Sequence, residues 1–277
     1  MPPMKTNPPI RLDMNKKIIP VSIFIVSLCL VGCGKKAMTI DPAIASSDEA
    51  LFLRGEQFAE KDPEKARLYF RQVIDSFPKS FYAQRAKIAI ADSYFEEQDE
   101  GSMIIAASEY REFISLYPYS PTAPTAQYKI AMTFYKKLLA PGRDQSKTRQ
   151  ALEEFRKVVK NYPTSDEAQL AQDKIIACEE NLAEHTLAIG RHYYKVHAYK
   201  AATSRLAEVL TAYPNFTKMD HVYFYLGDSY YGWEKPEEAV PYFTKLLSDY
   251  PQSKFIKKAT KRMELIQAEA QEIPSGK

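Results

Sequence analysis

The stretch Tyr223–Pro251, YFYLGDSYYGWEKPEEAVPYFTKLLSDYP, has the pattern of two helices that pack against each other. Apolar and aromatic residues recur in it at intervals of three and four, which is typical of helices with one buried face. Gly227 provides a small position where a neighbouring helix can approach closely, and Phe243, four residues after Ala239, can fill the groove beside it. Proline cannot continue a helix, so Pro251 ends the second one.

The same elements recur along most of the chain. An aromatic residue followed by proline occurs at Phe77-Pro78, Tyr117-Pro118, Tyr162-Pro163, Tyr213-Pro214 and Tyr250-Pro251. The intervals of 40, 45, 51 and 37 residues are typical of repeat proteins. An alanine lies twelve residues before each proline, with a large side chain four residues later, in the pairs Ala66/Phe70, Ala106/Tyr110, Ala151/Phe155, Ala202/Leu206 and Ala239/Phe243. The sequence therefore predicts an all-α solenoid of about five helical hairpins.

Smaller features sharpen this prediction. A serine two residues after the proline, at 80, 120, 165 and 253, is expected to cap the next helix. Ala91 and Ala131 hold the place of Gly227, so replacing Gly227 with alanine is expected to cost little stability. Repeat 1 is the most degenerate, with Arg54-Gly55 where an aliphatic and a small residue are usual.

Two insertions interrupt the repeat. Pro163 precedes the aliphatic-small pair at 189 by 26 residues instead of 12, and the extra length is about four helical turns, so residues 166–197 are expected to form one long helix. Between Phe134 and Ala151 an insertion containing Pro141-Gly142 predicts a surface loop.

The last predicted helix is amphipathic. Its apolar stripe consists of Ile256, Ala259, Met263 and Ile266, which predicts a C-terminal helix that caps the last repeat. Its other face is basic, with Lys254, Lys257, Lys258, Lys261 and Arg262. A solvated face is the favoured interpretation, and a site for an acidic partner is the alternative.

Composition and charge exclude several classes of protein. Only 9 of 277 residues are glycine, which argues against nucleotide-binding loops and tight β-hairpins. Four of the 38 basic and one of the 35 acidic residues lie in residues 1–32, so the remainder carries 34 of each. A neutral body gives no electrostatic footprint for nucleic acid, and no nucleic-acid partner is expected.

The N-terminus has the pattern of a lipoprotein signal. Lys16-Lys17 precedes the uncharged run Ile18–Val31, which is too short for a membrane span but suits a secretory signal. The run ends in Leu30-Val-Gly-Cys33, which resembles a bacterial lipobox, so Cys33 is the expected lipid attachment site. Met14 opens a conventional signal by itself, and residues 1–13 could be an over-called start.

These observations divide the chain into four predicted parts. Residues 1–32 are the signal peptide and residues 33–47 a lipidated tether without helical periodicity. Residues 48–165 hold repeats 1–3, and residues 166–277 hold the long helix, repeats 4 and 5 and the capping helix. Gly34 after the cysteine, by resemblance to Gram-negative lipoproteins, favours export to the outer membrane, with the folded part facing the periplasm.

The chain offers little chemistry. It has no Gly-rich phosphate loop, G-x-S-x-G, H-E-x-x-H or C-x-x-C motif, so no catalytic residues and no cofactor are expected. His185 and His192 are seven residues apart, about 10 Å along a helix, which is too far for a shared metal. Cys178 has no intramolecular partner and is expected to be a small buried apolar residue.

The hairpin pattern resembles the tetratricopeptide repeat. Tyr223, Leu226, Gly227, Tyr230, Ala239, Phe243 and Pro251 stand at the spacing of that motif, and Leu246 departs from it. With the lipobox, the tether and the long helix, the chain from about residue 33 to 271 resembles the BamD (ComL) family of outer-membrane lipoproteins. More specific pieces are Arg143-Asp-Gln145 leading into Ala151–Phe155, the step Tyr162–Ser165, and Ile189–Pro214.

The resemblance implies a non-enzymatic scaffold in the assembly of β-barrel proteins. Its implied partners are the periplasmic domains of a BamA-like barrel protein at the C-terminal repeats, other lipoproteins of the assembly machine, unfolded outer-membrane protein segments at the N-terminal repeats, and the membrane through the lipid. By position, Arg205 matches an arginine that the family uses near its BamA-facing half.

Two alternatives stay open at this point. One is another lipid-anchored repeat adaptor, for assembly of a pilus secretin or for envelope constriction. The other is an enzyme framed by helical repeats, as in some murein lyases, but such proteins need a separate catalytic domain, and the repeats already occupy residues 48–271.

Overall fold

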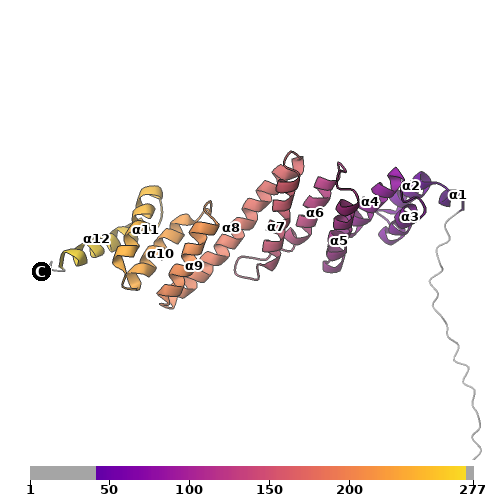
Figure 1. Ribbon diagram of the computed structural model, residues 1–277. Helices are drawn as coiled ribbons and strands as arrows, with labels where there is room; N and C mark the ends of the chain where they lie inside the picture. The colour runs from indigo at the N-terminus through magenta and orange to yellow at the C-terminus, as the bar shows by residue number, and fades with distance from the viewer. Residues whose placement is uncertain (1–41, 273–277) are drawn as a thin grey trace, which may run out of the picture. The chain divides into compact units, whose positions relative to one another are not determined.

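The computed structural model describes residues 42–272, and these residues form α-helices and no strand. The helices follow one another in chain order and are joined by short connections (Figure 1). They are α1 Pro42–Ala45, α2 Asp48–Phe58, α3 Pro63–Ser76, α4 Phe81–Glu97, α5 Glu100–Leu116, α6 Ala123–Tyr135, α7 Ser146–Asn161, α8 Asp166–Lys195, α9 Tyr199–Ala212, α10 Met219–Gly232, α11 Pro236–Asp249 and α12 Ile256–Glu272.

The helices pack as consecutive pairs, and the fold is the all-α solenoid of hairpins that the sequence predicts. The pairs are α2/α3, α4/α5, α6/α7, the second half of α8 with α9, and α10/α11, and α12 packs on the last pair. We call the first member of each pair its A helix and the second its B helix. From α2 to α12, each helix contacts the next one in the chain.

The aromatic-proline pairs end the B helices as expected. At each of these ends the aromatic residue is the C-cap, and its backbone N–H donates to a carbonyl four residues back, for example Phe77 N–H to Val73 O at 2.9 Å. The following proline has no N–H with which to continue the ladder.

The predicted serine caps are half right. The Oγ atoms of Ser80 and Ser165 accept hydrogen bonds from the backbone N–H three residues on, as N-caps do. Ser120 and Ser253 instead accept from the N–H two residues on, at 3.3 and 3.2 Å, in short serine turns. The helices that follow these two serines begin later, at Ala123 and Ile256.

In three of the pairs, the small residue of the A helix is a glycine that lies directly against the large side chain of the B helix. A Cβ built on Gly55 would lie 2.5 Å from Phe70, one on Gly190 2.7 Å from Leu206, and one on Gly227 2.9 Å from Phe243. Such distances are too short for an added methyl group unless a neighbour moves. Even the degenerate first repeat keeps this contact.

The geometry argues against the expectation that Gly227→Ala costs little. Ala91 and Ala131 are completely buried at the equivalent places, so the second and third pairs do hold a Cβ there. In the last pair the Phe243 ring is also completely buried and lies too close to leave room for one. The spacing of the motif does not show how closely the ring approaches.

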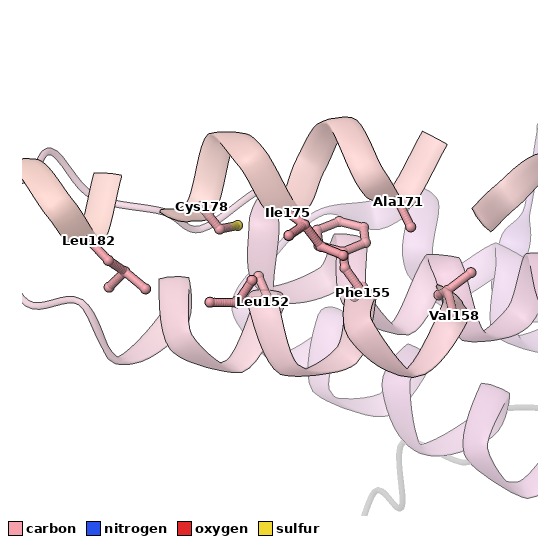
Figure 2. Close-up of a cluster of buried hydrophobic side chains, with 9 residues drawn as sticks. Leu152, Phe155, Val158, Ala171, Ile175, Cys178 and Leu182 are labelled. Atoms are coloured by element: carbon pink, nitrogen blue, oxygen red, sulfur yellow. The ribbon is translucent and has the colours of Figure 1, made fainter. Parts of the chain in front are cut away.

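The long insertion produces α8, a single helix of 30 residues close to the predicted 166–197. Its N-terminal half packs on α7 through Ala171, Ile175, Cys178 and Leu182, opposite Leu152, Phe155 and Val158 (Figure 2). Cys178 is completely buried in this cluster, and burial raises the pKa of its thiol to about 11. It is a packing residue, as expected.

The two ends of the described chain differ in how well they match expectation. Helix α12 buries Ala259 and Ile266 against the last pair, with Met263 packed partly against them, so the predicted cap is present. At the other end, Pro42–Ala45 form the short helix α1 within the stretch expected to be a tether. The proposed division at residue 165/166 stays a prediction.

We expect Gly227→Ala to lower the melting temperature and Gly227→Leu to lower it further. The cost of overpacking, about 1–3 kcal/mol, exceeds the gain in helix propensity from alanine, which is up to about 1 kcal/mol. Gly142→Ala is the control, because no atom lies within 4 Å of a Cβ built there. Thermal unfolding followed by circular dichroism tests this. If Gly227→Ala melts at or above the temperature of Gly142→Ala, the contact with Phe243 does not limit this position.

Candidate partner-binding surfaces

The sequence predicts two functional residues, Cys33 and Arg205, and the structure describes only the second. Cys33 lies outside the described residues. Arg205 lies on α9 with 52% of its side chain exposed, and its Nη1 donates to Glu208 Oε2 one turn away at 3.1 Å. An exposed arginine with a weak local partner remains available for a carboxylate on another protein.

Arg205 lines a cavity of about 180 Å³ between α7, α8 and α9. Arg149 of α7 and Glu208 of α9 also line it, so two guanidinium groups from neighbouring repeats and the one carboxylate paired with Arg205 share the space, which has an excess of positive charge. Leu182 and Ile189 of α8 contribute apolar surface. This cavity, which we call the two-arginine cavity, can accept an acidic side chain.

Tyr213 and His185 also line the two-arginine cavity. Burial raises the pKa of the Tyr213 hydroxyl, with Glu208 adding to the effect. The Nδ1 of His185 lies 2.6 Å from Pro141 O in the loop 136–145. A carbonyl only accepts, so Nδ1 carries the hydrogen. Asn181 Nδ2 donates to Leu139 O at 3.1 Å, and the two contacts hold the loop against α8.

A second cavity, of about 550 Å³, lies between α2, α3 and α4. Its floor includes Phe70, and its rim is acidic, with Glu56, Glu60, Asp92, Glu96 and Glu97. Arg85 pairs with Glu56, Lys129 with Asp92 and Arg67 with Glu97. Glu60 and Glu96 form no ion pair with any residue in the described range 42–272. The cavity, which we call the acidic cavity, therefore has an excess of negative charge.

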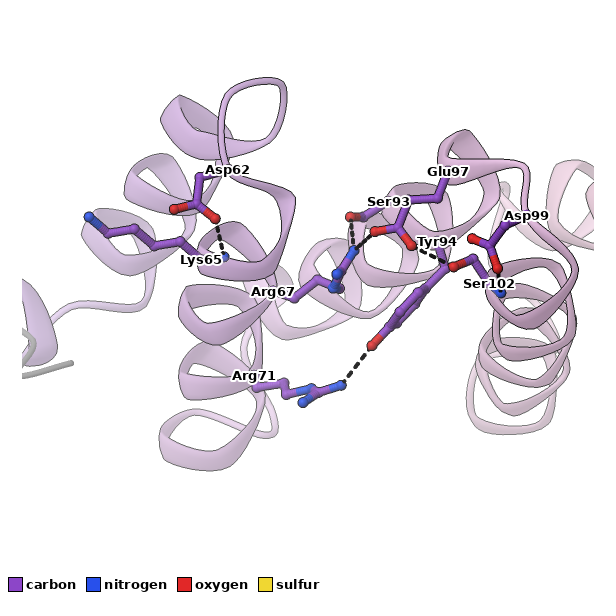
Figure 3. A network of polar contacts seen from close by, with 9 residues as sticks. All are labelled: Asp62, Lys65, Arg67, Arg71, Ser93, Tyr94, Glu97, Asp99 and Ser102. Carbon is purple, nitrogen blue, oxygen red and sulfur yellow. Dashed lines mark hydrogen bonds and ion pairs between the residues drawn. The ribbon is translucent and has the colours of Figure 1, made fainter. Parts of the chain in front are cut away.

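One wall of the acidic cavity is held by a polar network between α3, α4 and α5 (Figure 3). The buried Arg67 donates to Ser93 Oγ at 2.8 Å and to Glu97 Oε1 at 2.6 Å. The hydroxyl of Ser102 donates to the other oxygen of Glu97 at 2.5 Å. Hydrogen bonding from Ser102, assisted by Arg67, lowers the pKa of Glu97 against an opposing effect of burial.

Sequence reasoning missed Arg149 and the rim of the acidic cavity. Arg149 precedes Arg205 by 56 positions, and no repeat spacing connects them. The repeat does contain a signal for a different polar feature, because the triplet Asp-Ser-Tyr occurs at both 92–94 and 228–230. Each of these aspartates follows the small residue of its A helix and forms an ion pair with a basic residue further along the chain. Asp92 pairs with Lys129 of the next A helix at 2.7 Å, and Asp228 pairs with Arg262 of the cap α12 at 2.6 Å.

Within residues 42–272, no group of three or more His, Cys, Asp or Glu side chains is arranged to hold a metal ion. His221 packs edge-on against Phe255, and burial lowers the pKa of its ring. The described helices include none with the length and apolarity needed to cross a membrane.

Comparison with known protein families identifies the chain. The model of the YfiO family, described as "Outer membrane lipoprotein", matches residues 45–239, from α1 into α11. The chain belongs to this family.

Curated relatives agree with the YfiO assignment, and each of the following is named outer membrane protein assembly factor BamD. The protein of Caulobacter vibrioides is 28% identical and aligns with 83% of this chain and 75% of its own length. That of Neisseria meningitidis serogroup B is 23% identical over 88% of this chain and 94% of its own. The protein of Rickettsia prowazekii is 26% identical over 84% of this chain and 92% of its own length.

In this YfiO-family chain we expect Glu97→Gln to lower the free energy of unfolding by about 1 kcal/mol at pH 7, because the buried Arg67 loses its charged partner. The folded pKa of Glu97 lies below its unfolded value, so the carboxylate stabilises the fold above about pH 4.3. That contribution is lost as the pH falls through the folded pKa. Urea unfolding at pH 7 and at lower pH values should show the wild-type advantage shrinking.

Glu60→Gln is the matched control, because Glu60 lines the same cavity and forms no ion pair among the described residues. It should change the free energy of unfolding by less than about 0.5 kcal/mol. Equal effects of the two substitutions, or an effect of Glu97→Gln that is independent of pH, would contradict the role given to this network.

Proposed function

We propose that this chain is a non-enzymatic scaffold that assists the assembly and insertion of β-barrel proteins into the outer membrane. The observation that carries the proposal is the YfiO family match over residues 45–239, which spans most of the described repeats. The relatives named assembly factor BamD support this role over that of an adaptor for pilus secretin assembly or envelope constriction. Helical repeats with separate cavities suit a protein that brings partners together.

We propose that the chain is anchored through lipid on Cys33 and faces the periplasm. The support is the uncharged run that ends in Leu30-Val-Gly-Cys33. Stable anchoring requires more than one acyl chain, at about 0.8 kcal/mol per buried CH₂. Acylation of both the thiol and the amine freed by cleavage supplies this.

We propose that the two described cavities bind different partners. The acidic cavity of α2–α4 suits unfolded outer-membrane protein segments in which a lysine or arginine accompanies apolar residues, since Glu60 and Glu96 have no described ion pair. The two-arginine cavity of α7–α9 suits an acidic side chain on the periplasmic domains of a BamA-like protein. Other lipoproteins of the assembly machine are expected partners without an assigned surface.

Replacement of Cys33 by serine should abolish lipidation, because serine offers no thiol to receive the diacylglycerol. The variant should lose both its acyl mass and its processing at the junction before residue 33. Mass spectrometry of protein purified from membranes measures this. A native mature chain that begins at another residue and carries no lipid would rule out the anchor.

Arg205→Glu should weaken binding to the periplasmic domains of a BamA-like partner by about 1–3 kcal/mol, because the reversed charge would face a carboxylate in place of the guanidinium. Arg149→Glu should have a similar effect, since the residue lines the same cavity. Isothermal titration calorimetry with purified domains measures both dissociation constants.

Lys79→Glu is the control for charge reversal, because Lys79 is exposed and lies in the connection between α3 and α4. It should leave the dissociation constant unchanged. An unchanged constant for Arg205→Glu and Arg149→Glu as well would remove the two-arginine cavity from the interface.

A further inference from the structure

A third cavity, separate from the two-arginine cavity and the acidic cavity, lies between α8, α10 and α12. Its volume is about 380 Å³, which is within the range of about 300–1,000 Å³ that ligand sites occupy. Its lining consists of Tyr194, Phe224, Tyr225, Asp228, Lys258, Lys261 and Arg262. The family match ends at residue 239, so α12 lies beyond it.

The acidic group in this cavity is already neutralised. Asp228 is only 5% exposed, and both of its oxygens are occupied. Tyr194 donates its hydroxyl to Oδ2 at 2.5 Å, and Arg262 donates Nε to Oδ1 at 2.6 Å. Burial and hydrogen bonding to Asp228 raise the pKa of Tyr194, so the hydroxyl keeps its proton and remains a donor.

The basic groups are in excess. Lys258 and Lys261 line the cavity, are exposed, and form no ion pair with any residue of the described part of the chain. Arg191 of α8 lies over the ring of Tyr225 at 5.4 Å, and its buried Nε has no hydrogen-bond partner there. Because Arg262 balances Asp228, the remaining charge in and beside the cavity is positive.

The walls of the cavity are aromatic and held in place. Phe224 is buried and stacks on Phe255, with ring centroids 4.4 Å apart and an interplanar angle of 9°. Tyr194 packs edge-on against Tyr225 at 5.1 Å. A ligand therefore meets preformed apolar surface next to cationic groups, which suits a carboxylate with an apolar neighbour.

We propose that this cavity binds an acidic peptide segment, with an aspartate or glutamate side chain between Lys258 and Lys261 and an adjacent apolar side chain against Tyr225. A site for an acidic partner is the alternative that the sequence left open beside a solvated face. It is independent of the assembly role, because it concerns only what this cavity binds.

An anionic membrane surface is the competing ligand, and the distribution of lysines separates the two. A membrane would attract all the basic residues on this face, including Lys254 just before α12 and Lys257 within it, which lie outside the cavity lining. A peptide carboxylate seated in the cavity depends on Lys258 and Lys261. Equal charge removal at the two sites therefore has different consequences.

The test uses the full-length chain in a neutral detergent and the unlabelled peptide Ser-Glu-Phe-Glu-Ser-Gly with blocked ends. Isothermal titration calorimetry should show binding that weakens as salt increases. The double variant Lys258→Gln/Lys261→Gln should weaken it by about tenfold or more, which is 1.4 kcal/mol. The matched control Lys254→Gln/Lys257→Gln should stay within about twofold of wild type.

Three results would overturn the proposal. One is equal binding of the peptide in which glutamine replaces both glutamates, and another is equal weakening by the two double variants. The third is absence of peptide binding together with binding to phosphatidylglycerol vesicles that both double variants reduce alike, which would assign the basic face to a lipid surface. All four lysines are exposed, so circular dichroism should show unchanged folding in both variants.

Discussion

The close approach of a small residue on each A helix to a large side chain on its B helix is the constraint on which the described array depends. It occurs at Gly55/Phe70, Gly190/Leu206 and Gly227/Phe243, where no Cβ can be accommodated without movement. A helix pair fixed at this distance aligns its apolar faces, and the pair can then bury them against the next one. Ala91 and Ala131 hold the same position in the other two pairs. Because a small residue is kept at this position in every pair, an insertion such as that in α8 can lengthen one helix without altering the packing of its neighbours.

Ion pairs from an A helix to the next A helix, or to the cap α12, add a second level of order. Asp92 and Asp228 both follow the small residue of their helix, and both pair with a basic residue further along the chain. Each also accepts a tyrosine hydroxyl at 2.5 Å, from Tyr110 and from Tyr194. Such partly buried groups are tolerated because their hydrogen bonds are satisfied. These ion pairs occupy the A-helix surface without giving it a net charge.

The sequence predicts those features of the structure that recur at a regular spacing. The helix pairs, the long helix α8, the buried Cys178 and the cap α12 depend on spacing, and spacing is visible in the sequence. The distance between Gly227 and the Phe243 ring is not visible in the sequence, since both Gly and Ala satisfy the repeat pattern. The sequence also does not show that Arg149 and Arg205 line the same cavity, because this depends on how α7 and α9 flank α8. The position of Lys258 and Lys261 beside the aromatic residues of α10 is not visible either, because it depends on how α12 packs on the last pair.

The proposed binding of partners rests on a few residues outside the repeated framework. The acidic cavity of α2–α4 and the cavity of α8, α10 and α12 each contain one neutralised aspartate at the same repeat position. They differ in the charges left over, Glu60 and Glu96 in the first and Lys258 and Lys261 in the second. These four residues are exposed, so their replacement affects stability little, whereas the buried glycines and aromatic residues cannot vary in the same way. One framework can thus present opposite charges at two cavities, because the residues that set the charge of each cavity are separate from those that hold the helices together.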